Sequence, residues 1–482
     1  MPQSFNWSCF ESRVTETVRL WHASLKQPPR PGRRYTLQEQ RRSENAYDDA
    51  LRSVEREAWH APRTARDRLT SQQRVIAAFA GFSTSALDLD PAATDLLTRD
   101  FLPVGAALAR WARHFDPNLT MEDITQACRN AWTACGLQPL LGDRIGLTPA
   151  ILSYSLLYPY SDNYLDRSDL PQSDKLCFSR RFRSRLRGEE LTAQKAHEHA
   201  VWALVALIEQ QYPRLLYPCV FESLLAIHRA QEDSLAQLGA AAHVDPDRLL
   251  RISCAKGGSS VLADACLAHG SLTREEGHFA FIWGVLLQLG DDLQDVREDI
   301  ERNAATLFTR AVSLGQPLDS LVIQLLHFSD VVASRMDSLP HGSPVLKNLL
   351  RMSWRSLILM AVAWAHEFFT PDFLAEAESR SPFRFGFLRT RRGRLIGHQG
   401  LCTALFNNFT ETAETACDLA FPDQLPASLL NELSIRASPQ SLSPHSRAVS
   451  AKLLLRTGLC ASAAAGQCSR RGSSGTDPHR TH

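Results

Sequence analysis

Apolar residues recur at helical spacing along most of the chain, from about residue 73 to residue 435. Steps of three and four residues place apolar side chains on one face of a helix, and short polar breaks separate the runs. The clearest runs are 201–208, 249–268, 279–300, 321–332 and 345–369. Few stretches alternate with a period of two. The pattern therefore predicts an all-α fold, a bundle of helices without a sheet.

Three regions of the chain differ in composition. Residues 1–70 are charged and rich in arginine, with a proline-rich break at 28–31, and are expected to form a peripheral segment with two short helices. Residues 71–435 are expected to form the helical domain. Residues 436–482 are rich in Ser, Ala, Arg and Gly. A segment of that composition buries too little apolar surface to fold, so we expect disorder there.

The segment 281–300, FIWGVLLQLGDDLQDVREDI, carries the strongest signal. One apolar stripe follows steps of four and three residues: Ile282, Leu286, Leu289, Leu293, Val296 and Ile300. The other faces of its first half are apolar too, which is typical of a helix in a protein interior. Yet the same predicted helix continues into four carboxylates: Asp291, Asp292, Asp295 and Asp299.

Three of these carboxylates, Asp291, Asp295 and Asp299, lie at positions i, i+4 and i+8 of the predicted helix. Like charges at this spacing repel, and desolvating them is costly. A bound cation would offset both costs, and oxygen ligands without Cys or His favour Mg²⁺. The alternative is the solvated end of a surface helix, with Arg297 and Arg302 as neutralising partners.

A second acidic cluster follows the apolar run 151–160. Asp162 and Asp166 are again four residues apart, and Asp169 comes next. Pro159 lies inside the run, so the helix is expected to kink or to begin there. DxxxD alone is a weak signal, and a surface helix would explain it. The pairing carries more weight, because about 125 intervening residues would allow the two clusters to face each other across a bundle.

Composition narrows the possible functions. Of 482 residues, 44% are hydrophobic and 22% charged, with a formal net charge of +1, which gives no global attraction to nucleic acid. The 11 cysteines are scattered without a CxxC pair, as expected in a reducing cytoplasm. The N-terminus lacks the pattern of a signal peptide. The most apolar stretch, 356–365, is shorter than the ~20 residues of a membrane span. Peripheral membrane contact stays open.

Together these residues resemble the class I isoprenoid synthase superfamily, across roughly residues 70–400. QLGDDLQDVREDI resembles the second Asp-rich motif of trans-prenyl diphosphate synthases, and its DxxxD resembles that of squalene and phytoene synthases. The i, i+4, i+8 spacing is similar to the metal triad of class I terpene cyclases. DNYLD, with Asp162 and Asp166, resembles the first Asp-rich motif. The overall pattern is similar to bacterial class 1 isoprenoid biosynthesis proteins.

The resemblance implies an isoprenoid synthase-type helical bundle around a central apolar cavity. It implies up to three Mg²⁺ ions, held by the acidic residues Asp162, Asp166, Asp291, Asp292, Asp295 and Asp299. It also implies that an allylic prenyl diphosphate is bound by Lys256, Arg229, Tyr160 and Gln288. Lys256 opens KGGSS, and its two glycines are expected to kink the helix or to allow close helix packing.

The chain departs from the family pattern in two places. Asn163 stands where elongating enzymes usually carry a second Asp, and no paired-Arg motif follows in the usual form. These departures weigh against chain elongation. We therefore expect a terpene synthase, with squalene- or phytoene-type coupling and chain elongation as alternatives.

Three other expectations are open to a structural test. A non-catalytic helical scaffold is one rival to the enzyme. A di-iron bundle is another, because Glu57–His60 and Glu275–His278 match the Glu-x-x-His spacing. The basic stretch 384–395 is expected to be a solvated or partner-facing loop, or alternatively a segment that closes over diphosphate.

Overall fold

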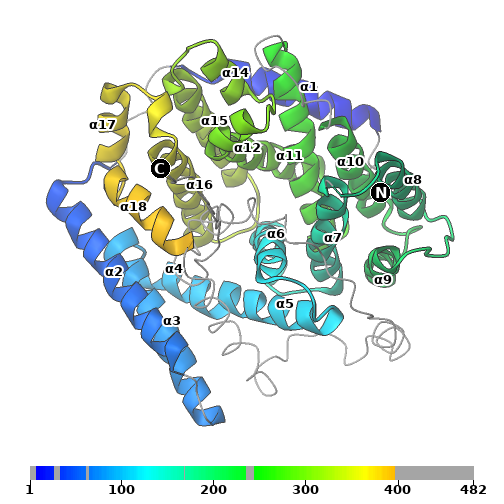
Figure 1. The fold of residues 1–482 in the computed structure, drawn as a ribbon, viewed down its shortest axis with the longest axis horizontal. Coiled ribbons are helices and arrows are strands. Elements are labelled where there is room, and N and C mark those ends of the chain that lie inside the picture. The colour runs from blue at the N-terminus through cyan, green and yellow to red at the C-terminus, as the bar shows by residue number, and fades with distance from the viewer. Residues whose placement is uncertain (1–6, 27–32, 61–63, 168, 235–243, 397–482) are drawn as a thin grey trace, which may run out of the picture.

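The computed structural model describes residues 7–26, 33–60, 64–167, 169–234 and 244–396 (Figure 1). Within these ranges the chain is helical, without a strand, so the predicted all-α fold is confirmed. Residues 397–435 and the predicted disordered segment 436–482 lie outside the described residues. In the described ranges, every helix is too short or too polar to cross a bilayer.

Two adjacent helices, α11 (Pro246–His269) and α12 (Arg274–Gln294), form the centre of the bundle (Figure 1). Gly270, with φ at 84°, ends α11. Thr273 and Glu276 then form a capping box that begins α12, since each accepts a hydrogen bond from the other's backbone N–H. The two helices therefore run antiparallel and share most of their length.

The other helices surround this pair, and one continuous hydrophobic core joins most of them. Before this pair in the chain come α5 (Leu102–Phe115), α6 (Met121–Leu140), α7 (Pro149–Asp166), α8 (Gln172–Leu186), α9 (Ala196–Gln211) and α10 (Pro218–Ser234). Further along the chain come α13 (Val296–Glu301), α14 (Leu307–Ser313), α15 (Asp319–Asp337), α16 (Pro344–Trp364), η4 (His366–Phe368), α17 (Pro371–Ser379) and α18 (Phe385–Ile396).

The apolar stripe predicted along 281–300 is confirmed from Ile282 to Val296, whose members are at most 2% exposed. Phe281 and Trp283, on other faces of α12, are buried as well. The expectation was wrong at Ile300, which is 43% exposed. Because α13 ends at Glu301, its last turn reaches the surface, and the interior part of the helix stops near Val296.

Glycines allow α11 and α12 to touch backbone to backbone. A Cβ added at Gly284 would lie 2.8 Å from the carbonyl carbon of Gly257 and 3.0 Å from Cβ of Val261. A Cβ at Gly258 would meet the ring of Phe281. Helix α11 runs unbroken through these positions. Of the two readings of the KGGSS glycines, close helix packing is therefore correct and the kink is wrong.

The N-terminal region is more helical than the sequence predicted. Helix α1 (Trp7–Ala23) places Phe10 and Trp21 in the main core. Helices α2 (Leu37–Trp59) and α3 (Ala65–Leu87) lie side by side as a long hairpin (Figure 1). The domain boundary predicted at residue 70 falls inside α3. The short α4 (Pro91–Asp95) and the π-helical η1 (Leu96–Phe101) then lead into α5.

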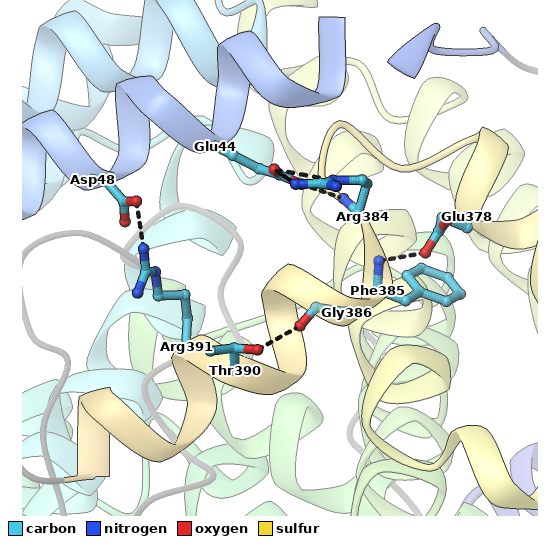
Figure 2. A network of polar contacts seen from close by, with 8 residues as sticks. All are labelled: Glu44, Asp48, Glu378, Arg384, Phe385, Gly386, Thr390 and Arg391. Carbon is cyan, nitrogen blue, oxygen red and sulfur yellow. Dashed lines mark hydrogen bonds and ion pairs between the residues drawn. The ribbon is translucent and has the colours of Figure 1, made fainter. Parts of the chain in front are cut away.

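The basic stretch 384–395 is a helix rather than the expected loop, and it docks on α2 (Figure 2). Nε of Arg384 donates to both oxygens of Glu44, at 2.9 and 3.1 Å, and Arg391 pairs with Asp48. Glu378 accepts from the backbone N–H of Phe385 at 2.6 Å and so caps the start of α18. Two arginines of the basic stretch, Arg384 and Arg391, are thus paired with carboxylates of α2.

Candidate functional site

The acidic segment after α12 is helical with one local break. Helix α12 ends at Gln294, Asp295 has φ −94° and ψ 2°, and α13 begins at Val296. The expectation of one uninterrupted helix therefore needs correction. However, Asp295 N donates to Asp291 O at 2.8 Å and Asp299 N donates to Asp295 O at 2.9 Å. These bonds keep the i, i+4, i+8 relation, so the half-buried Asp291, Asp295 and Asp299 share a side.

Asp292 differs from the other three carboxylates, because it is only 7% exposed. Its Oδ2 accepts from Oγ of Ser253 at 2.7 Å and its Oδ1 accepts from Nε2 of Gln288 at 2.8 Å. Burial raises the pKa of Asp292, while the two hydrogen bonds and the positive charge of Lys256 oppose that rise. Asp292 thus braces α12 against α11, which is not the environment expected for a metal ligand.

The structure brings Lys256, Gln288 and Asp292 together, as a binding site for diphosphate would require. Lys256 is half-buried on α11, and the charge of its ammonium group acts on Asp292 across the helix crossing. Its neighbour Gly257 lies against Gln288, since a Cβ there would overlap that side chain. The close glycine packing therefore positions a cation beside the acidic end of α12.

Two contacts fix the direction of α7 relative to α11. Before α7 begins, Oδ2 of Asp143 lies 2.7 Å from Nδ1 of His269, the last residue of α11. One turn into α7, the hydroxyl of Tyr154 donates to the carbonyl of Ser260 at 3.4 Å. As α7 advances, its partners on α11 move toward the N-terminus. The two helices therefore run antiparallel, and α7 ends near the beginning of α11.

Counting along both helices from this contact gives the level of the first acidic motif. From Tyr154 to Asp162 is eight residues, about 12 Å of helix, and from Ser260 back to Ser253 is seven residues, about 10.5 Å. With antiparallel axes, this count directs the backbone of Asp162 toward the level of Ser253, which hydrogen-bonds Asp292. We therefore expect the acidic ends of α7 and α12 to lie at the same end of the bundle.

The side chains of Asp162 and Asp166 lie outside the described residues, so their directions stay predictions. Helix α7 begins at Pro149, capped by Thr148, and runs through to Asp166, which excludes a start at Pro159. Asp169, the last acid of this cluster, is exposed, and its carboxylate pairs with the guanidinium of Arg167, with Nε to Oδ1 at 2.9 Å. That hydrogen bond lowers the pKa of Asp169.

Comparisons with models of protein families, with curated proteins and with solved structures found no match for this chain. What the site can do therefore rests on its own chemistry. One end of the bundle carries half-buried carboxylates and a lysine next to an apolar interior. Such a set of groups suits a polyanion bound through a divalent cation, because carboxylate oxygens and phosphate oxygens are both ligands that Mg²⁺ prefers.

Two predicted substrate-binding residues have other environments. The hydroxyl of Tyr160 donates to Oδ2 of Asp116 at 2.6 Å, which ties α7 to the end of α5. Burial raises the pKa of Tyr160, and the charge of Asp116 adds to the rise. Arg229 lies on the exposed face of α10 with its side chain 61% exposed, and its Nε is 3.7 Å from Asp233. This is the placement of a solvated arginine.

Three aromatic residues of α7 and α12 are packed in the core. Phe281 and Trp283 are 1% and 3% exposed, and Trp283 packs on Trp354 with ring centroids 5.6 Å apart. Tyr164 stacks on His197 with centroids 3.8 Å apart. Core packing accounts for the positions of all three. The central apolar cavity stays a prediction.

The di-iron alternative finds no assembled site. Glu57 of α2 accepts from Arg74 at 3.3 Å, and Glu275–His278 lie in the first turn of α12. Nδ1 of His278 is 3.6 Å from Glu16 of α1. Among the side chains that the structure describes, no group of three or more His, Cys, Asp and Glu is arranged to hold a metal by itself. That search does not include the side chains of Asp162 and Asp166.

A buried polar cluster deeper in the bundle was not foreseen. Asp264 of α11 is 1% exposed and accepts from Nδ2 of Asn130 at 2.9 Å. The same amide group donates to Oγ of Ser155 at 3.3 Å, so the cluster joins α11, α6 and α7. Burial raises the pKa of Asp264 well above its ordinary value. A lone Asp in the apolar run VLADACL was the available signal.

Proposed function

We propose that this chain is a class I isoprenoid synthase that ionises an allylic prenyl diphosphate and cyclises the resulting carbocation. The observation that supports the proposal is the antiparallel course of α7 along α11, which directs the acidic end of α7 toward the beginning of α11. Asp162 lies near the end of α7, Asp295 directly follows α12, and the charge of Lys256 on α11 acts on Asp292 of α12. Every other part of the proposal depends on this arrangement.

The donor groups fit Mg²⁺. They are carboxylates only, and they come from two helices rather than from one preformed cluster, so a bound diphosphate would complete the coordination. Asp162 and Asp166 would hold the metal on one wall, and Asp291, Asp295 and Asp299 on the other, for up to three ions. When bound, Mg²⁺ supplies the positive charge that stabilises the departing diphosphate.

The protein's own groups have three tasks in this proposal. Lys256 donates hydrogen bonds to the diphosphate oxygens. The bond from Ser253 of α11 to Asp292 of α12 holds the two helices in register, so that Lys256 and Asp291 keep a fixed separation, and the bond from Gln288 within α12 orients the carboxylate of Asp292. The apolar faces of α11 and α12 exclude water below the acidic end, which prolongs the life of a carbocation.

The first step breaks the same bond in all three synthase reactions considered. The allylic C–O bond breaks, and its electron pair leaves with the diphosphate. In a cyclase, a double bond of the same substrate then supplies electrons to the cationic carbon, and loss of a proton or addition of water ends the reaction. Squalene- or phytoene-type coupling and chain elongation instead use a second prenyl substrate.

A product assay tests the proposal and separates its alternatives. Purified full-length protein is incubated with geranyl, farnesyl or geranylgeranyl diphosphate and Mg²⁺, with and without isopentenyl diphosphate. A cyclic hydrocarbon or alcohol is expected. A longer diphosphate would establish elongation, and a coupled hydrocarbon would establish head-to-head synthesis. If no substrate releases diphosphate, the chain is a scaffold and the proposal fails.

Single substitutions assign the activity to the site. Asp295→Asn and Lys256→Gln should each lower kcat/KM by about 100-fold or more, because each removes charge that acts on the leaving group. Asp330→Asn, on the exposed face of α15, is the matched control and should keep full activity. Equal activity of Asp295→Asn and the control would place the chemistry elsewhere.

A further inference from the structure

The turn between α9 and α10 carries two large apolar side chains with almost no protein contact. Leu215 is 97% exposed and Leu216 is 74% exposed, more than any other exposed large hydrophobic residue in the described ranges. Pro213 and Pro218 flank them and are exposed as well. We call Pro213, Leu215, Leu216 and Pro218 the apolar tip. Two adjacent leucines held in water are unusual enough to require an explanation.

The apolar tip is held in one conformation by the residues around it. The carbonyl of Pro213 accepts from the N–H groups of Leu216 and Tyr217 at 2.9 and 3.0 Å. The guanidinium of Arg214 donates to Glu209 at 2.7 Å and to the carbonyl of Leu186 at 2.6 Å. The leucines are therefore presented by a rigid turn, and little conformational entropy would be lost when they are buried.

The apolar tip lies at the end of the bundle opposite to the acidic residues. Tyr217 packs against Gly270 at the end of α11, where a Cβ would lie 2.9 Å from its ring. Ser253, which hydrogen-bonds Asp292, is seventeen residues earlier on the same helix, about 25 Å away along the axis. A surface that bound the tip would leave the acidic end open to solvent.

Size and charge indicate what the tip contacts. A stable protein complex buries about 800 Å² on each partner, whereas this convex tip offers on the order of a few hundred Å². The charged side chains on the adjoining ends of α8 and α9 and on the turn itself include three of each sign, Arg185, Arg187, Arg214, Glu189, Glu190 and Glu209, and Arg185 and Arg214 pair with Glu209. An apolar projection with no net charge suits a fluid apolar medium behind an electrically neutral surface.

We propose that the apolar tip inserts into a lipid bilayer and anchors the protein reversibly to membranes, with neutral phospholipids sufficient for binding. The anchor is independent of the proposed catalytic function, since it requires neither metal nor substrate. Two leucines bury less apolar surface than a single long acyl chain, which itself gives only weak and reversible attachment. Binding is thus expected at millimolar lipid and in rapid exchange.

Co-sedimentation with sucrose-loaded vesicles tests the anchor. The full-length protein is mixed with phosphatidylcholine vesicles at 0.1 and 0.5 M salt. Leu215→Glu/Leu216→Glu should lower the apparent affinity by about tenfold or more, and salt should have little effect on the wild type. Leu314→Glu, at a 45% exposed leucine of another turn, is the control and should bind like the wild type.

Each other outcome overturns the proposal. Equal sedimentation of the double variant and the wild type would show that the tip is not the anchor. Binding only to vesicles with phosphatidylglycerol, lost at 0.5 M salt, would show an electrostatic surface instead. Light scattering completes the test, because a dimer that dissociates in the double variant would identify a second copy of the chain as the occupant. Unchanged circular dichroism of the variants confirms that they fold.

Discussion

The contact between α11 and α12 predicts that Gly284→Ala destabilises the protein, although alanine favours a helix more than glycine does. The added methyl group would lie 2.8 Å from the carbonyl carbon of Gly257 and closer still to its oxygen. Carbon atoms pack best at about 3.5–4.0 Å, so the helices must separate by at least about 0.7 Å. The obstacle is backbone, which cannot rotate away.

The expected change in the free energy of unfolding is the difference between two opposing effects. Overpacking of a buried contact costs about 3 kcal/mol where the neighbours cannot yield, and alanine in place of glycine returns at most about 1 kcal/mol of helix propensity. The expected net loss is about 2 kcal/mol of unfolding free energy. Gly81 lies within α3 with nothing within 4 Å of an added Cβ. Gly81→Ala should therefore gain about 0.5–1 kcal/mol.

Urea denaturation followed by circular dichroism compares the two variants with the wild type. The difference between Gly284→Ala and Gly81→Ala is expected to be about 3 kcal/mol, with the wild type between them. If Gly284→Ala proved as stable as Gly81→Ala, the close crossing of α11 and α12 would be wrong. The arrangement of Lys256, Gln288 and Asp292 would then lose its foundation.

Two further predictions concern buried titratable groups. Burial lowers the pKa of His197 to about 4. As the pH falls from 6.5 to 4 the unfolded chain therefore binds a proton that the folded chain excludes, and the free energy of unfolding should fall by about 2 kcal/mol. Urea titrations of His197→Phe should show a smaller loss over the same pH range than those of the wild type. Burial raises the pKa of Asp264, so its contribution to stability is present in acid and is lost as pH rises above the unfolded value of about 3.9. Asp264→Asn should therefore be more stable than the wild type at pH 8 by about 1 kcal/mol or more, and a less stable variant would contradict the raised pKa of this buried carboxyl group.

Local periodicity was sufficient to predict the central helix and its buried face. The stripe from Ile282 to Val296 follows from side-chain geometry alone, and α12 buries it as expected. The burial of Asp292 could also have been predicted from the sequence. It lies three residues after Leu289 and four before Val296, which places it beside the apolar stripe, whereas Asp291 and Asp295 lie farther around the helix.

Contacts between distant segments could not be predicted from the same pattern. The basic stretch 384–395 looked like a solvated loop because its partners, Glu44 and Asp48, are about 340 residues away. The glycines of KGGSS were compatible with a helix kink or with close helix packing, and only the position of Gly284 on a neighbouring helix decides between the two. Tyr160 was assigned to substrate, but the nearby Asp116 takes its hydroxyl.

Calorimetric titration with pyrophosphate tests the central claim most directly, because it measures the shared site without any assumption about the product. We expect the wild type and Asp330→Asn to bind pyrophosphate only when Mg²⁺ is present. Asp162→Asn and Asp295→Asn should each weaken that binding by tenfold or more, since each removes a proposed ligand from one of the two proposed walls. Binding that needs no Mg²⁺, or that survives the loss of either carboxylate unchanged, would contradict a magnesium site formed jointly by the ends of α7 and α12.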